Sequence, residues 1–138
     1  MGFDSSTKHK DWVKTVSDYI RMEYPKGSTW GAVFVTVGEP TDTSRPYIDL
    51  SDYKKVSLEL RGEENGETIL IGLKDNTDPD DGSETKVRIS NITTQWQTYE
   101  IELSRFRTAN LHKLYVVTEL VFERDPKILF LKNIKFLP

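Results

Sequence analysis

Three runs of alternating apolar and polar residues give the clearest indication of the fold: WQTYEIELSRF at residues 96–106, LYVVTELVFE at 114–123 and ILFLKNIKF at 128–136. Alternation with a period of two places every second side chain on one face, as in a strand with one buried face. Polar loops separate the three runs. We therefore predict neighbouring antiparallel strands in this part of the chain.

The same alternation, or a high content of β-branched and aromatic residues, predicts further strands upstream. We expect them at residues 18–24, 30–37, 55–61, 68–75 and 84–90. Few helical patterns lie between them, which disfavours a parallel βαβ arrangement. The sequence thus predicts an all-β fold, an antiparallel jelly-roll β-sandwich of about eight strands.

The 138 residues are expected to form a single domain. A chain of this length can bury a core without disulfides or structural metals. Residues 1–16 are polar, and we expect a partly disordered N-terminal segment there, with a short helix over residues 5–16 as an alternative. Nothing in this segment resembles a signal peptide, and no apolar run is long enough to span a membrane.

Composition and motifs exclude several classes of function. The net charge of −3 and the pI near 5.4 argue against a nucleic-acid partner, which needs a basic face. The absence of cysteine excludes thiol catalysis and thiolate metal sites. Glycoside hydrolysis needs two carboxyl groups placed across the scissile bond in a desolvated pocket, whereas Glu63, Glu64 and Glu67 lie in or beside a solvated turn. His9 and His112 have no neighbour with metal-ligand spacing. We therefore expect a binding module and not an enzyme.

Several segments carry a resemblance to a known family. They are Tyr24-Pro25-Lys26-Gly27 leading into Trp30-Gly31-Ala32-Val33, Lys55-Val56-Ser57-Leu58 with Arg61-Gly62-Glu63, Thr94-Gln95-Trp96-Gln97-Thr98-Tyr99, and Phe130-Leu131-Lys132-Asn133-Ile134-Lys135-Phe136. They resemble galactose-binding-like jelly-roll domains of the carbohydrate-binding-module type. The likeness is to family eleven modules and to the complex I intermediate-associated protein 30 domain.

The resemblance implies a non-catalytic module that holds a polysaccharide or oligosaccharide in a groove on its concave sheet. It also implies a monomer within a longer multidomain chain, where it tethers an attached enzyme to its substrate, outside the cell or on its surface. Many such modules carry a structural calcium to which an acidic residue of the closing strand contributes. Here the closing strand has Lys132-Asn133, and an ammonium repels a cation, so the expectation is no cofactor.

Sugars are bound by aromatic rings that stack on their faces and by polar groups that pair with their hydroxyls. The candidate ligand-binding residues are Trp30, Tyr47, Glu59, Arg61, Lys74, Arg88, Tyr115 and Glu119. The alternative for the charged members is an ordinary solvated sheet face. Trp96 is expected at the edge of the core. The acidic loop at residues 75–82 is a weak calcium candidate whose spacing does not match an EF-hand.

The favoured function is therefore polysaccharide binding. The alternative is a protein-interaction or structural jelly-roll domain without sugar binding. Exposed aromatic residues in a groove would favour the first, and their absence from the concave face would favour the second.

Overall fold

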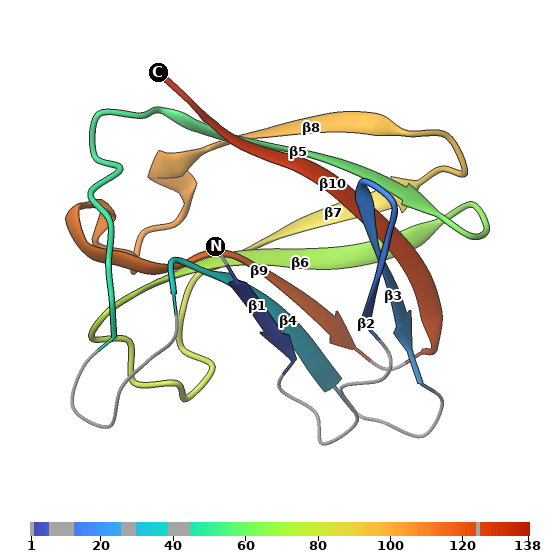
Figure 1. The fold of residues 1–138 in the computed structure, drawn as a ribbon, viewed down its shortest axis with the longest axis horizontal. Helices are drawn as coiled ribbons and strands as arrows, with labels where there is room; N and C mark the ends of the chain where they lie inside the picture. Colours follow the sequence, from blue (N-terminus) through green and yellow to red (C-terminus); the bar gives the residue numbers. More distant parts are fainter. Residues whose placement is uncertain (1, 6–12, 26–29, 39–44, 124) are drawn as a thin grey trace.

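The computed structural model describes residues 2–5, 13–25, 30–38, 45–123 and 125–138. Two antiparallel sheets are stacked as layers (Figure 1). Sheet A contains, in spatial order, β1 (Gly2–Ser5), β4 (Trp30–Thr36), β9 (Leu114–Glu123), β6 (Glu67–Asp75) and β7 (Lys86–Ile92). Sheet B contains β2 (Val13–Val16), β3 (Tyr19–Tyr24), β10 (Lys127–Leu137), β5 (Lys55–Gly62) and β8 (Gln97–Glu102).

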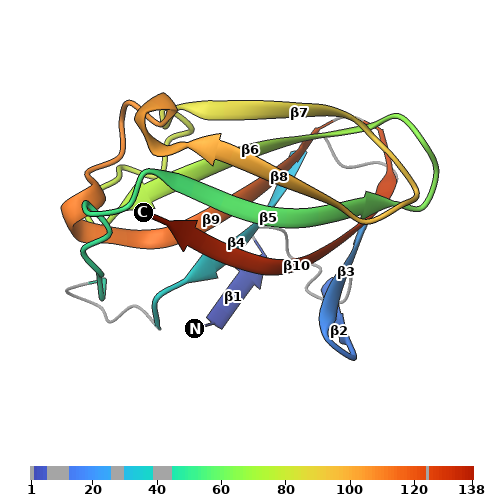
Figure 2. The same cartoon turned by 90° about the horizontal axis from the view of Figure 1, so that it is seen from above.

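The chain crosses repeatedly between the sheets, which confirms the predicted jelly-roll sandwich. It passes from β3 in sheet B to β4 in sheet A, back to β5, and then to β6. After the β6–β7 hairpin it crosses again for each of β8, β9 and β10 (Figure 2). Among the described residues, the 3₁₀ helices Leu103–Arg105 and Leu111–Lys113 are single turns. No helix in the described part of the chain is long and apolar enough to cross a membrane.

The described residues form ten strands, and the two that the sequence did not predict lie near the N-terminus. β1 pairs with β4 and β2 pairs with β3. The expected helix over residues 5–16 is wrong for Val13–Val16, which is a strand, while residues 6–12 lie outside the described residues. Every described side chain of β2 except that of Val13 is exposed, so β2 lacks the apolar alternation that marks a half-buried strand.

Alternation along the strands separates the core from the outer faces, as predicted. In β6, Ile69, Ile71 and Leu73 are buried in the core cluster between the sheets. The intervening residues, Leu70, Gly72 and Lys74, therefore point to the outer face of sheet A. Across the core, Tyr24 of β3 stacks on Phe122 of β9 with ring centroids 5.5 Å apart.

β9 lies in the middle of sheet A, between β4 and β6. Its register places Glu119 opposite Phe34 of β4 on one side and opposite Gly72 of β6 on the other. Side chains from three strands therefore meet on the outer face around Glu119.

Candidate functional site: a groove on the outer face of sheet A

A groove of about 600 Å³ lies on the outer face of sheet A. Strands β4, β6 and β9 and the start of β7 line it, together with part of the loop at residues 76–85 that joins β6 to β7. We call this loop the acidic loop, because Asp78, Asp80, Asp81 and Glu84 lie in it. In Figure 1 the loop lies below β6 at the left of the picture, and it contributes one wall of the groove.

An apolar strip along β4 provides the aromatic part of the groove. Trp30, Ala32 and Phe34 alternate along this strand and all line the groove. Trp30 is 57% exposed, although tryptophan is among the side chains that gain most from burial. An exposed indole in a groove with fixed polar groups has the surface that ring stacking on a sugar requires.

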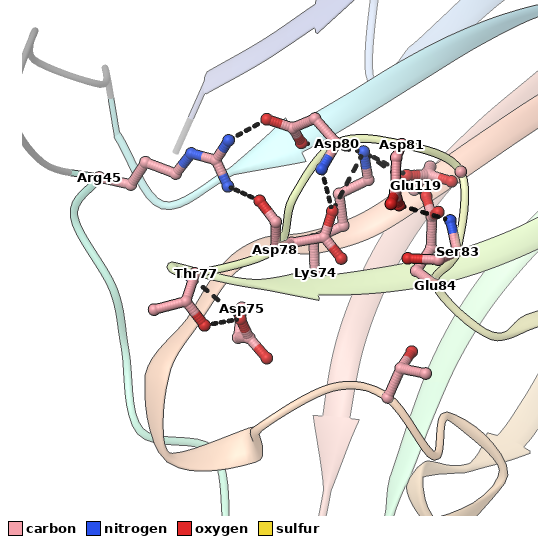
Figure 3. A network of polar contacts seen from close by, with 12 residues as sticks. Arg45, Lys74, Asp75, Thr77, Asp78, Asp80, Asp81, Ser83, Glu84 and Glu119 are labelled. Carbon is pink, nitrogen blue, oxygen red and sulfur yellow. Dashed lines mark hydrogen bonds and ion pairs between the residues drawn. The ribbon is translucent and has the colours of Figure 1, made fainter.

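The polar part of the groove is centred on the buried ammonium of Lys74 (Figure 3). Its Nζ lies 3.2 Å from Asp80 Oδ1, 3.5 Å from Glu84 Oε2 and 3.5 Å from Glu119 Oε2. A fourth carboxylate, that of Asp78, lies 3.8 Å away, and the ring centroid of Phe34 lies 4.8 Å away. The ammonium is therefore in contact with carboxyl groups of the loop and of β9 at once.

These contacts shift the pKa values of Lys74 and Glu84. Burial alone lowers the pKa of Lys74, but the nearby carboxyl groups of Glu119 and Glu84 raise it above its ordinary value. Burial raises the pKa of Glu84, but the hydrogen bond with Glu119 and the charges of Lys74 and Lys86 lower it overall. Both groups are therefore charged at neutral pH.

The carboxyl group of Glu119 differs from that of Glu84 in the direction of its pKa shift. Glu119 is 1% exposed and, within the described part of the chain, lacks hydrogen-bond donors around its carboxyl oxygens. Neither of its carboxylate oxygens accepts a hydrogen bond from the described residues. Burial, a hydrogen bond with Glu84 and the charge of Glu84 together raise the pKa of Glu119 to about 8. With its pKa at about 8, Glu119 is mostly protonated at neutral pH, whereas Glu84 is ionised.

Gly72 makes room for this carboxyl group. A Cβ atom at position 72 would lie 3.2 Å from Glu119 Oε1, closer than side chains normally approach. The glycine in the middle of β6 thus allows Glu119 to lie flat over the sheet.

Further hydrogen bonds fix the acidic loop. Arg45 donates to the carbonyl oxygen of Asp78 at 3.1 Å and forms an ion pair with Asp80. Lys86 donates to the carbonyl oxygen of Gly82 at 2.9 Å. At the base of the loop, Asp75 accepts hydrogen bonds from the backbone and hydroxyl of Thr77, both at 2.9 Å (Figure 3).

The interior of the acidic loop holds a lysine where a calcium hypothesis would place a cation. Lys74 is in contact with Asp78 and Asp80, two of the residues that motivated that hypothesis. In the portion of the chain that the structure describes, no three His, Asp or Glu side chains are arranged to hold a metal ion. In the closing strand, the amide of Asn133 donates to Glu59, and Lys132 lies over Trp96. Neither residue offers a carboxylate to a cation.

Three of the eight candidate residues meet in the groove: Trp30, Lys74 and Glu119. Arg88 lines a neighbouring cavity of about 730 Å³ at the end of the sandwich. Leu70, Val121 and Glu123 line both cavities, so the two are adjacent.

The two candidate tyrosines do not line either cavity. Tyr47 is 53% exposed, and Lys113 Nζ lies 5.7 Å from its ring centroid. Tyr115 lies at the start of β9, where the guanidinium of Arg45 is 5.5 Å from its ring centroid. They are therefore near the loop region of sheet A but outside the groove itself.

Glu59 and Arg61 belong to β5 and so lie on sheet B, away from the other candidates. The Arg61 guanidinium is 3.8 Å from the ring centroid of Phe130 and 5.2 Å from that of Trp96. Trp96 is half-buried by these contacts on the outer face of sheet B and is not part of the core cluster, contrary to the expected core-edge position. The two candidate arginines thus lie on opposite sheets, Arg61 on sheet B and Arg88 on sheet A together with Lys74.

Sequence reasoning missed Phe34, Glu84 and Lys86, which also line the groove. Phe34 could have been found, because it lies on the same face as Trp30 in an alternating strand. Lys86 could also have been found, because it alternates with the buried Val87 and Ile89 in the strand expected at residues 84–90. Glu84 lies in the acidic loop, where no periodic pattern indicates the direction of a side chain.

The family comparison gives a match over almost the whole chain. The model of the family described as carbohydrate binding domain 30 matches residues 3–138. A search of curated proteins found no match.

Solved structures with the same fold include carbohydrate-binding modules. A family 11 carbohydrate-binding module from Clostridium thermocellum, in complex with a β-1,3-1,4-mixed-linked tetrasaccharide, has 18% identity and a TM-score of 0.69, covering 99% of this chain and 84% of that chain. The family 30 module of the cellulosomal cellulase Cel9D-Cel44B from the same organism has 19% identity and a TM-score of 0.65, covering 91% and 85%. An exo-β-agarase has 10% identity and a TM-score of 0.66, covering 100% of this chain but 23% of that chain.

The structural likeness supports the jelly-roll fold, and the family match over residues 3–138 shows the family to which the chain belongs. The prediction of a non-catalytic binding module is thereby confirmed. This chain belongs to the carbohydrate binding domain 30 family and is a carbohydrate-binding module without catalytic function.

Proposed function

We propose that the groove on the outer face of sheet A binds an extended polysaccharide, and that the ligand is a β-glucan. The observation that supports this most directly is the exposed indole of Trp30 beside fixed polar side chains in one groove. The family 11 module with this fold was solved with a β-1,3-1,4-mixed-linked tetrasaccharide, which makes that sugar the natural first probe.

In this proposal the indole of Trp30 stacks on one sugar ring, and polar groups of the acidic loop pair with hydroxyls. Asp80 and Asp81 are exposed and line the groove, so their carboxylates are accessible acceptors. Lys74 acts indirectly, because its ammonium is already surrounded by carboxylates and its side chain is only 8% exposed. Sugar hydroxyls and groove residues both give up water on binding, so we expect modest affinity.

Trp30→Ala should weaken binding of the mixed-linked tetrasaccharide at least about tenfold, a loss of roughly 1.4 kcal/mol or more. The stacking surface is lost, whereas the exposed position of the indole makes little contribution to the core. Isothermal titration calorimetry against the tetrasaccharide, with xylan, mannan and galactan fragments for comparison, measures this.

Arg61→Ala is the matched control, because Arg61 lies on the outer face of sheet B. It should leave the dissociation constant unchanged while lowering the thermal midpoint slightly, since Phe130 becomes uncovered. If Arg61→Ala weakened binding and Trp30→Ala did not, the binding site would lie on sheet B and the proposed groove would be refuted.

We further propose that the module is extracellular and holds an attached enzyme close to its polymer. A tethered enzyme experiences a higher effective substrate concentration without any new catalytic contact. The exo-β-agarase with this fold supports the idea, because the matched region is a minor part of that longer chain.

A further inference from the structure

The cluster around Lys74 holds more carboxyl groups than cations. The cations are Arg45, Lys74 and Lys86, and the carboxyl groups around them are those of Asp78, Asp80, Asp81, Glu84 and Glu119. Even with Glu119 protonated, three positive charges face four negative charges. Loss of that proton adds a further negative charge beside Glu84, at the two acids whose side chains are only 2% exposed.

The same cluster connects the acidic loop to the sheet. Lys74 on β6 contacts Glu119 on β9 and also Asp80 and Glu84 of the loop. Lys86 on β7 contacts Glu84 from the other side, at 3.4 Å. The position of the acidic loop, which forms one wall of the groove, therefore depends on whether the carboxyl groups of Glu119 and Glu84 attract or repel each other.

The protonation state of Glu119 decides whether the two carboxyl groups attract or repel. When protonated, Glu119 can donate a hydrogen bond to Glu84, and the two carboxyl groups attract. When ionised, it accepts no hydrogen bond from the described residues and faces the charge of Glu84 next to the ring of Phe34. Two buried carboxylates in contact repel each other, and the single ammonium of Lys74 must then neutralise both.

We propose that Lys74, Glu84 and Glu119 form a proton-dependent switch that holds the acidic loop against the groove while Glu119 is protonated and loosens it when Glu119 ionises. This rests on the proposed function insofar as the loosened loop lowers sugar affinity. Burial and the contact with Glu84 place the pKa of Glu119 at about 8, so the switch operates in mildly alkaline solution.

The first test needs no ligand. The side-chain carboxyl ¹³C shift of Glu119 and the hydrogen-exchange protection factors of residues 76–85 are followed by NMR from about pH 6 to about pH 9.5. We expect protection of the loop to fall at least about fivefold over the same range in which Glu119 titrates. A loop whose protection stays constant while Glu119 titrates would overturn the switch.

The second test uses the mixed-linked tetrasaccharide as the probe. Wild-type affinity should fall at least about threefold between the two pH extremes, whereas Glu119→Gln should keep the high affinity throughout. Glu100→Gln, an exposed glutamate on β8 of sheet B, is the matched control and should retain the wild-type pH dependence. If Glu119→Gln keeps the wild-type pH dependence, the inference is wrong.

The two tests separate the switch from the proposed function. If the tetrasaccharide and the other sugars fail to bind at any pH, the proposed function fails, and the NMR titration still decides the switch. Should Glu119→Gln not fold, the wild-type protection factors decide it in the same way.

Discussion

Lys74→Met will lower the free energy of unfolding by about 3–5 kcal/mol, the cost of breaking a buried ionic cluster by removing one partner. Methionine fills a similar volume, so the loss will come from charge and not from a cavity. Glu84 and Glu119, whose side chains are each 2% exposed, will be left without the ammonium between them. Urea unfolding at neutral pH, followed by tryptophan fluorescence, measures the change.

Two variants show whether the effect belongs to the buried cluster. Lys86→Met removes a half-buried lysine from the rim of the same cluster and should cost only about 1 kcal/mol. Combining Lys74→Met with Glu84→Gln should recover part of the lost stability, because the ionised acid of the buried pair becomes neutral. Equal losses for Lys74→Met and Lys86→Met would contradict the central role of Lys74.

Stability should fall as the pH rises from about 4.5 to about 8, by an amount on the order of 4 kcal/mol. The pKa of Glu119 is raised to about 8 in the folded protein from its ordinary value of 4.5. Between these values the folded state holds a proton that the unfolded chain has released. The stabilisation is therefore complete below the lower value and is lost as the pH approaches the higher one.

Below about pH 4 other carboxyl groups reverse the trend. The pKa values of Glu84 and Asp75 are lowered in the folded state, so their contribution is lost as they become protonated in acid. Thermal unfolding across the pH range should thus show a maximum on the acidic side of neutrality. Glu119→Gln should abolish the decline toward pH 8, and a variant that declined as steeply as the wild type would assign the effect to another group.

The strands were predictable because each has one face in the core. In β5, Val56, Leu58 and Leu60 alternate with polar residues and are buried. Their burial stabilises the fold by roughly several kcal/mol, and a shift of the strand by one residue would lose this stabilisation because the three side chains would face water. β2 gave no such signal, because it pairs with β3 alone at the edge of sheet B and is mostly exposed.

The site was predictable only in part, because alternation distinguishes inward from outward but not one sheet from the other. Arg61 and Lys74 both alternate with core residues, yet β5 and β6 belong to opposite sheets. No periodic pattern in the sequence predicts that the Lys74 side chain is buried. It depends on acids from a loop and from β9, brought together by pairings between strands about forty residues apart in the chain.

The position of the last two strands has a consequence for synthesis of the protein. β9 separates β4 from β6, and β10 separates β3 from β5, so each completes the middle of one sheet. Until both have left the ribosome, the earlier strands cannot form either sheet as a continuous layer, and their apolar faces stay uncovered. Folding of the sandwich is therefore expected to wait until β10 has emerged and to be slow, with apolar faces open to aggregation until then.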